Sequence, residues 1–122
     1  MTVHGVGIDI VCLPRIRALV DRYGEQFENR WFDPSELAQT GDPAVCLARS
    51  FAVKEAVWKA LRIESIRHLA WRDIVATDHD GSIEVLLSGA VKSVAESHAV
   101  TAITAQALVR NDLVIATAIA EI

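Results

Sequence analysis

Apolar positions near the start of the chain follow two different periods. Residues 3–11 form a run dominated by valine and isoleucine, which predicts a strand buried on both faces. Pro14 then suits the first turn of a helix. From Arg15 to about Phe27 the apolar residues recur every three or four positions, which is typical of an amphipathic helix. We therefore expect one strand followed by one helix.

The remaining pattern alternates between helical and extended segments. Residues 32–40 carry an aspartate followed by a proline, which marks the start of a helix. Residues 44–61 predict a long helix, since they are rich in alanine and leucine and contain no glycine or proline. Within 71–89, two strand-like runs flank Asp80-Gly81, which is a good hairpin signal. Residues 89–97 predict a short helix, and the apolar tail predicts two more strands joined by a polar turn.

These elements predict an α+β fold with a mainly antiparallel sheet packed with a long helix. The alternation of strands and helices is not regular enough for a doubly wound sheet. A chain of 122 residues is sufficient for one domain, and we expect it to span residues 1–122.

Composition narrows the class of protein. A net charge of −4 argues against nucleic acid as the main partner. We expect a cytoplasmic protein without a membrane partner, because no apolar run is long enough for a membrane span and the first residues lack the pattern of a signal peptide. Cys12 and Cys46 form no C-x-x-C pair, so two buried, reduced thiols are expected.

Carboxylates and ammonium groups supply the candidate chemistry. Asp9 lies in or at the end of the most apolar strand, where an ionised carboxylate is costly unless it is paired or binds a metal. Glu55 and Lys59 are four residues apart on one helix face, and Lys54 is turned about 100° away. Asp9 and Glu55 together would suit magnesium, which takes one or two carboxylates plus phosphate oxygens and water. The alternatives are a strand-end turn at Asp9 and a surface ion pair between Glu55 and Lys59.

Other motifs carry weaker signals. Gly5 and Gly7 form a G-x-G that fits a phosphate loop or the close packing of a strand on a helix. The four histidines show no metal-ligand spacing, which argues against zinc. Residues 13–24 are locally basic, and Arg15 and Arg22 project from one helix face, which hints at an acidic partner.

Several motifs follow one another along essentially the whole chain. They are G-x-G-I-D at 5–9, Arg15-Ile16, F-D-P-S-E-L at 32–37, A-R-S-F-A-V-K-E-A-V-W-K-A at 48–60 and W-R-D-I at 71–74. In this order and spacing they resemble the small holo-[acyl-carrier-protein] synthases, the 4'-phosphopantetheinyl transferases that modify carrier proteins.

The resemblance implies a 4'-phosphopantetheinyl transferase-like fold that assembles as a homotrimer with active sites between subunits. It also implies a magnesium-dependent transfer of phosphopantetheine from coenzyme A to a serine of an acyl carrier protein, in fatty acid or polyketide synthesis. The implied residues are Asp9 and Glu55 for magnesium; Asp9, Glu55 and Lys59 for catalysis; Arg49, Lys54, Lys59 and Gly81 for coenzyme A; and Arg15 and Arg22 for docking of the carrier protein.

The sequence departs from the family at the nucleotide end of coenzyme A. Ser50 replaces an arginine, Ser82 follows the hairpin glycine in place of a lysine, and Asp42 stands where a basic residue can occur. In the C-terminal strand, Val109 replaces a histidine, and Gln106 and Leu108 replace serines. Each change removes a donor or a positive charge. Losing such partners, at about 1.5–3 kcal/mol each, would weaken coenzyme binding.

Three hypotheses follow from this pattern. The first is a transferase with an altered coenzyme pocket. The second is a protein that binds a carrier protein or its tethered chain without using coenzyme A, and the third is an enzyme that acts on a carrier-bound substrate through Asp9, Glu55 and Lys59. The first is favoured because the two carboxylates have no evident structural reason to occur together.

Overall fold

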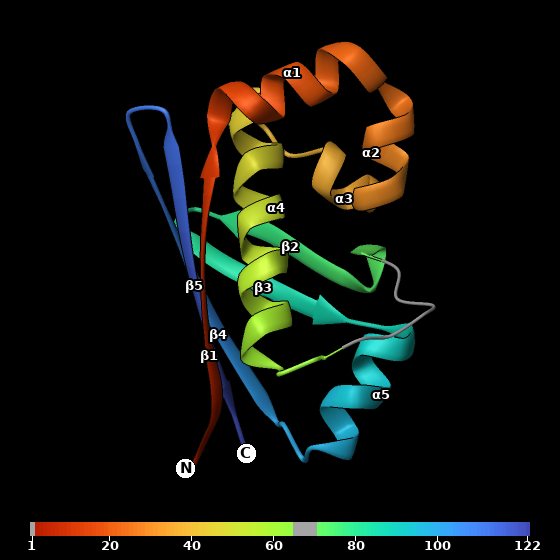
Figure 1. Ribbon diagram of the computed structural model, residues 1–122, viewed down its shortest axis with the longest axis vertical. Helices are drawn as coiled ribbons and strands as arrows, with labels where there is room; N and C mark the ends of the chain where they lie inside the picture. The colour runs from red at the N-terminus through yellow and green to blue at the C-terminus, as the bar shows by residue number, and fades with distance from the viewer. Residues whose placement is uncertain (1, 65–70) are drawn as a thin grey trace.

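A three-stranded antiparallel sheet and one long helix form the centre of the protein (Figure 1). The computed structural model describes residues 2–64 and 71–122. The sheet has the order β1-β5-β4, and α4 packs along one of its faces. These elements are β1 (Val3–Cys12), α4 (Pro43–Ala60), β4 (Ala102–Arg110) and β5 (Leu113–Glu121).

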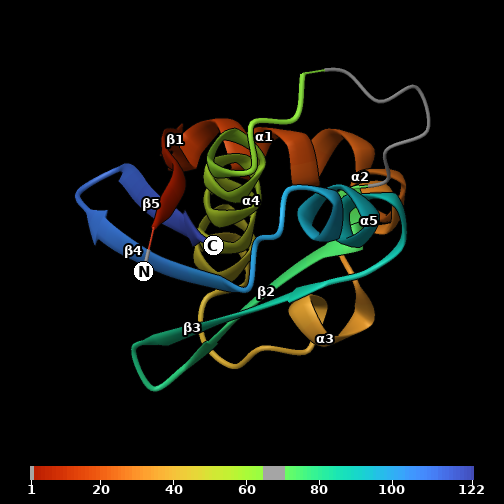
Figure 2. The same ribbon diagram turned by 90° about the horizontal axis from the view of Figure 1, so that it is seen from below.

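The remaining elements surround α4 on the sides that the sheet leaves open. Three helices lie over its N-terminal half, and a two-stranded hairpin crosses it on the side away from β1 (Figures 1 and 2). A short helix after the hairpin leads back to β4. These elements are α1 (Leu13–Tyr23), α2 (Glu25–Trp31), α3 (Pro34–Leu37), the 3-10 turn η1 (Trp71–Asp73), β2 (Ile74–His79), β3 (Ser82–Leu87) and α5 (Gly89–Ser97).

This architecture confirms the α+β class and the predicted long helix, hairpin, short helix and two C-terminal strands. The long helix is central because it presents apolar side chains in nearly all directions. Ala52, Val53, Ala56, Val57 and Ala60 are each 0% exposed. In the part of the chain that the structure describes, no helix is both long and apolar enough to cross a bilayer.

The single helix predicted from Arg15 to about Phe27 is wrong: this segment is divided between two helices, α1 and α2. Gly24 has φ 52° and ψ −126°, and its N–H bonds to the carbonyl of Val20. That left-handed conformation suits glycine and ends α1, so α2 starts in a new direction. The apolar spacing continues across the break, which is why periodicity alone does not reveal it.

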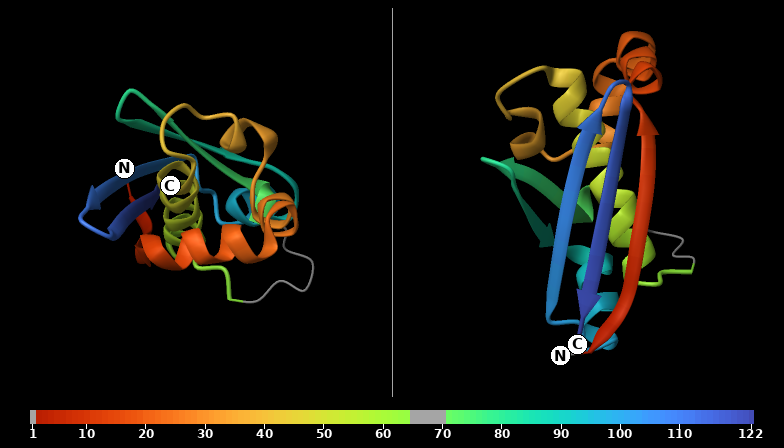
Figure 3. Two further views of the ribbon diagram at one scale, coloured as in Figure 1. Left: turned by 90° about the horizontal axis from the view of Figure 1, so that it is seen from above. Right: turned by 90° about the vertical axis from the view of Figure 1, so that its left-hand side faces the viewer.

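The expected burial of the first strand on both faces is wrong for the single chain. Gly7 and Val11 face α4 and are buried, whereas Val6, Ile8 and Ile10 point away and are 56–59% exposed. The right-hand view of Figure 3 shows the outer face of the three strands uncovered. Cys12, expected to be buried, is also exposed, and only Cys46 is buried.

The two glycines of the G-x-G motif allow β1 to touch α4. A Cβ atom on Gly5 would lie 2.1 Å from the carbonyl oxygen of Ala60, and one on Gly7 would lie 1.8 Å from that of Ala56. Both contacts are far below van der Waals distance, so neither position has room for a side chain. Close strand–helix packing therefore explains this motif.

Candidate active site

Asp9, Glu55 and Lys59 meet where the middle of β1 crosses α4. The Lys59 Nζ lies 3.1 Å from Asp9 Oδ1 and donates to the carbonyl oxygen of Ile8 at 2.9 Å. The side chain of Asp9 is 13% exposed, and that of Lys59 is 48% exposed. The structure thus brings together the three residues that were predicted to carry catalysis.

Local geometry explains this meeting. Because β1 lies directly against α4 at Gly7 and Ala56, the next inward-facing residue of the strand, Asp9, is adjacent to the helix. Glu55 and Lys59 are one helical turn apart, so both project toward the same part of β1. The glycines therefore position the site without forming part of it.

The carboxyl of Glu55 has a raised pKa. Its burial is the main cause, and the negative charge of Asp9 adds to it, while Lys59 and Arg15 act in the opposite direction. Glu55 is therefore close enough to Asp9 for the two carboxylates to interact. Their mutual repulsion is reduced by a proton or by a cation.

The donor set fits magnesium. Among the described residues, no group of three or more histidine, cysteine, aspartate or glutamate side chains is placed to hold a metal ion. Asp9 and Glu55 form a pair of oxygen donors, and magnesium commonly uses one or two carboxylates and completes its shell with phosphate oxygens and water. A site of this kind is open to a phosphate-bearing substrate.

Lys54, expected to contact coenzyme A, lies in the core instead. It is 0% exposed and pairs with Glu36 Oε1 at 2.7 Å. Its Nζ also donates to the carbonyl oxygens of Trp71 and Ile74. Because its donors are used in the interior, Lys54 is not available to a phosphate, and the prediction is wrong for this position.

Glu36 is the buried partner of Lys54, a role for which no expectation was drawn from its sequence pattern. Its side chain accepts from the backbone N–H of Asp33 at 2.9 Å and from that of Ala76 at 3.1 Å. Burial raises the pKa of Glu36 and lowers that of Lys54, and each charge opposes the other's shift. The pair joins α3, α4 and β2. The signal for it was the capping box in which Asp33 starts α3 and Glu36 follows three residues later.

Arg49 and Gly81 lie beside a different cavity. Arg49 precedes Glu55 by six helical positions, so it projects from another side of α4, toward the hairpin. The cavity there has a volume of about 510 Å³, and Arg49 and Asp78, which both line it, pair at 3.1 Å. Gly81 forms the hairpin turn at φ 90°, and its N–H donates to Asp78 Oδ1. In the single chain, Arg49 and Gly81 lie at the hairpin and not beside Asp9 and Glu55.

Two of the departures from the family pattern have structural roles here. Ser50 is buried and donates to the carbonyl oxygen of Ala76 at 2.7 Å. Asp42 starts α4 by accepting from the N–H of Ala44, and its other oxygen pairs with Arg17 at 2.8 Å. Val109 is half-buried in β4 opposite Val114 of β5. None of these side chains adds a positive charge to the cavity.

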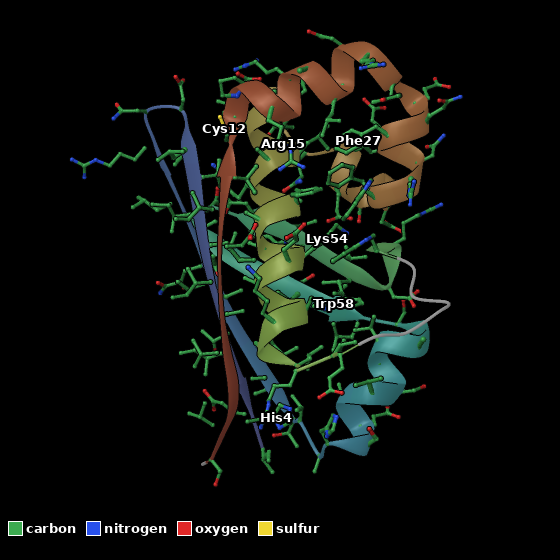
Figure 4. All side chains as sticks on the ribbon, in the orientation of Figure 1. His4, Cys12, Arg15, Phe27, Lys54 and Trp58 are labelled. Carbon is green, nitrogen blue, oxygen red and sulfur yellow. The ribbon has the colours of Figure 1, made fainter. Side chains whose placement is uncertain are left out.

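Arg15 borders a second hollow, which we call the front groove. It is a cavity of about 480 Å³ between α1, α2 and α4, with Leu19, Phe27, Trp31 and Phe51 as apolar lining and Arg15 and Arg30 as cationic lining. Figure 4 shows Arg15 and Phe27 near the N-terminal part of α4. Arg22, which was grouped with Arg15, does not line the groove; its guanidinium carbon lies 5.3 Å from the centre of the Tyr23 ring.

Comparisons with known proteins agree with this arrangement. Residues 5–118 match the model of the 4'-phosphopantetheinyl transferase superfamily. A holo-[acyl-carrier-protein] synthase of Roseiflexus sp. is 41% identical over 99 residues, covering 75% of this chain and 71% of that protein. One of Neisseria meningitidis is 32% identical over 123 residues, covering 98% of both chains.

Solved structures show the same fold. The crystal structure of the Neisseria meningitidis holo-[acyl-carrier-protein] synthase superposes with a TM-score of 0.88 at 31% identity, covering 98% of this chain and 99% of that chain. The Helicobacter pylori holo-[acyl-carrier-protein] synthase in complex with coenzyme A has a TM-score of 0.82 at 28% identity, covering 95% and 99%. This chain belongs to the 4'-phosphopantetheinyl transferase superfamily, alongside the holo-[acyl-carrier-protein] synthases.

Proposed function

We propose that this protein is a cytoplasmic, magnesium-dependent enzyme that transfers 4'-phosphopantetheine from coenzyme A to a serine of an apo acyl carrier protein. The observation that carries the proposal is the meeting of Asp9, Glu55 and Lys59 where β1 crosses α4. The relatives named above are holo-[acyl-carrier-protein] synthases, and one of them has been solved with coenzyme A. Fold, family and site chemistry therefore point to the same reaction.

Asp9 and Glu55 are the residues that would hold magnesium, which supplies charge neutralisation at the pyrophosphate when it is bound. Lys59 supplies the protein's own positive charge beside Asp9. Its Nζ is fixed by Asp9 and the carbonyl of Ile8, and its side chain stays half-exposed. It is therefore positioned to neutralise charge that develops on the transferred phosphate.

The reaction requires one bond to form and one to break. The serine oxygen of the carrier protein forms a bond to the β-phosphorus of coenzyme A. The bond from that phosphorus to the bridging oxygen breaks, and adenosine 3',5'-bisphosphate leaves with that oxygen. The serine proton passes to Glu55, directly or through a water.

The remaining site residues hold the two substrates. Arg49 and Gly81 would contact the nucleotide end of coenzyme A at the hairpin cavity. Arg15, at the edge of the front groove, would bind an acidic helix of the carrier protein, and Arg22 on the same helix would add a second positive charge. Arg15 is near enough to Glu55 to lower its pKa, so carrier docking brings the serine close to the carboxylates.

Assembly as a homotrimer is part of the proposal. Large apolar side chains are exposed on the outer face of the three-stranded sheet, which is more than an isolated chain commonly leaves in water. They include Val6, Ile8, Ile10, Leu108 and Ile119, which are 37–59% exposed. Covering this face with other copies would also allow the hairpin cavity of one subunit to complete the Asp9 site of another.

A second function is favoured because side chains expected near coenzyme A are already engaged within the protein. Lys54 is buried, Arg49 pairs with Asp78, and Ser50 is bound inside the core. Such a chain could bind a carrier protein, or act on its tethered chain, without using coenzyme A. The front groove serves this function equally well.

One experiment separates the two functions. Apo acyl carrier protein is incubated with this protein, coenzyme A and magnesium, and its intact mass is measured. A gain of one phosphopantetheine that is lost on chelation of magnesium is expected. No gain with several carrier proteins, all of which a known transferase modifies, would favour carrier binding without coenzyme A.

A further inference from the structure

The three tryptophans of the chain form one stacked row. The rings of Trp58 and Trp71 have their centres 4.9 Å apart, and those of Trp71 and Trp31 are 4.5 Å apart and nearly parallel. Trp31 also contacts Phe51, with ring centres 4.6 Å apart. We call Trp31, Trp58 and Trp71 the tryptophan wall. Its members come from α2, α4 and η1, and each is only half-buried.

One end of the wall lies at the candidate active site. Trp58 is one turn beyond Glu55 on α4 and directly precedes Lys59. Figure 4 shows Trp58 on the side of α4 away from the three-stranded sheet. Asp9 therefore borders the site on the side of β1, and Trp58 borders it on the opposite side.

The other end of the wall lies at the front groove. Trp31 lines that groove together with Phe27, Phe51 and Arg15. Ring contacts therefore run from the groove at Trp31, through Trp71, to Trp58, which is one helical turn from Glu55. Half-exposed aromatic rings in a continuous row are a common feature of binding surfaces, because the ring faces are apolar and the indole N–H can donate.

The phosphate-binding cations are few in this chain. Lys54 is committed to Glu36, and the only partner of Arg49 in the ion pairs of the described residues is Asp78. The hairpin cavity also carries Asp80 and Glu84, which oppose binding of an anion there. Contacts to the uncharged part of the donor are therefore needed for its affinity.

We propose that the tryptophan wall binds the pantetheine arm of coenzyme A and that Trp58 is a specificity-determining residue for the arm. This inference rests on the proposed function. The geminal methyl groups of the arm pack on the indole faces, and its amide carbonyls accept from indole N–H groups. Adenosine 3',5'-bisphosphate has no such arm, so the wall retains the donor and not the nucleotide that leaves.

Calorimetric titration with coenzyme A and with adenosine 3',5'-bisphosphate, both with magnesium, tests the proposal. Trp58→Ala is expected to weaken binding of coenzyme A by about tenfold, as expected for loss of a buried aromatic contact, and to leave bisphosphate binding unchanged. Trp58→Phe is expected to retain most of the affinity. Because all three tryptophans lie in the wall, wild-type fluorescence is also expected to change with coenzyme A and not with the bisphosphate, which requires no variant.

Different failures have different meanings. Equal loss of both ligands in Trp58→Ala, or no loss of either, would overturn the role of the wall while leaving transfer by the wild type intact. Loss of carrier-protein affinity alone would assign the wall to the carrier protein instead. If wild-type protein neither binds coenzyme A nor modifies a carrier, the proposed function fails, and this inference fails with it.

Discussion

Gly7 in β1 and Ala56 in α4 are in direct backbone contact: a Cβ atom on Gly7 would lie 1.8 Å from the carbonyl oxygen of Ala56. The neighbouring atoms are helix backbone, which cannot turn aside as a side chain can. Gly7→Ala is therefore expected to lower the free energy of unfolding by about 3 kcal/mol or more. It should also reduce transfer, because β1 can no longer hold Asp9 against α4. Urea denaturation and a transfer assay measure the two effects.

Gly81→Ala is the matched control for the stability part of this prediction. A Cβ atom there meets nothing within 4 Å, and only the positive φ of 90° is affected. Its expected cost is about 1–2 kcal/mol, the strain of a left-handed residue that carries a side chain. If Gly7→Ala were no more destabilising than this control, the close packing would not be what positions the site.

The sequence predicted most of the elements and the central trio of the site. Asp9 is conspicuous in the sequence because an aspartate is unusual in an apolar strand. Glu55 and Lys59 form a pair on one helix face, and all three residues lie within the motifs that resemble the family. Their proximity depends on Gly5 and Gly7 in β1. The G-x-G motif alone did not distinguish close packing on a helix from a phosphate loop. The predicted α+β class followed from hairpin and helix signals that depend only on nearby residues.

Tertiary contacts explain what the sequence did not predict. Lys54 follows the same pattern as a surface lysine, and only the position of Glu36, 18 residues earlier, makes it a core residue. Likewise, valine and isoleucine in β1 are equally consistent with burial on one face or both, and the exposed face is evident only from the fold. The tryptophan wall joins three distant segments and has no signature in spacing.

Glu55→Gln is expected to have opposite effects on stability and on transfer. Burial, and then the charge of Asp9, raise the pKa of Glu55 above its usual 4.5, so the native state binds a proton that the unfolded chain releases. The stabilising contribution of Glu55 is present below pH 4.5 and is lost as the pH rises through the raised pKa. At neutral pH without magnesium, the variant should therefore unfold at a higher urea concentration than wild type, and this gain should disappear below pH 4.5.

Transfer and magnesium binding provide the other half of this test. Glu55→Gln and Asp9→Asn are each expected to abolish transfer, and magnesium should stabilise the wild type but neither variant. The readouts are the mass of the carrier protein and the denaturation midpoint with and without magnesium. Full activity in either variant would contradict the assignment of the two carboxylates as metal ligands.

Lys54→Met is expected to destabilise the protein strongly. The substitution leaves the carboxyl of Glu36 buried without its 2.7 Å partner, and breaking a buried pair in this way typically costs about 3–5 kcal/mol. The double variant Lys54→Met with Glu36→Gln is expected to recover part of the loss, because a neutral amide needs no counter-charge. Urea denaturation of the two variants measures this recovery. A single variant as stable as wild type would mean that the pair contributes little.

Arg15→Glu is expected to raise the KM for the carrier protein by about tenfold, which corresponds to the loss of one charge-assisted contact, and to lower kcat less. Arg17→Glu is the control, because Arg17 lies on the same helix but pairs with Asp42 outside the front groove. Steady-state kinetics at two salt concentrations measure both variants, and the difference between them should shrink at high salt. Equal effects of the two substitutions would indicate general charge attraction rather than docking at Arg15.

Ile8→Lys is expected to convert a trimer into monomers. The side chain of Ile8 lies on the uncovered face of the three-stranded sheet, where it is 56% exposed, and a charge there would be costly to bury against another subunit. Leu37→Lys is the control, since Leu37 is also an exposed apolar side chain, at 37%, but lies on α3, away from that face and outside the hairpin cavity. Light scattering after size exclusion gives the mass of each variant.

Because Ile8 interacts with Lys59 only through its backbone carbonyl, the contact of Lys59 with Asp9 is kept in the variant. A monomeric protein that still transfers phosphopantetheine at the wild-type rate would show that one chain holds a complete site, whereas loss of transfer together with the trimer would place the site between subunits.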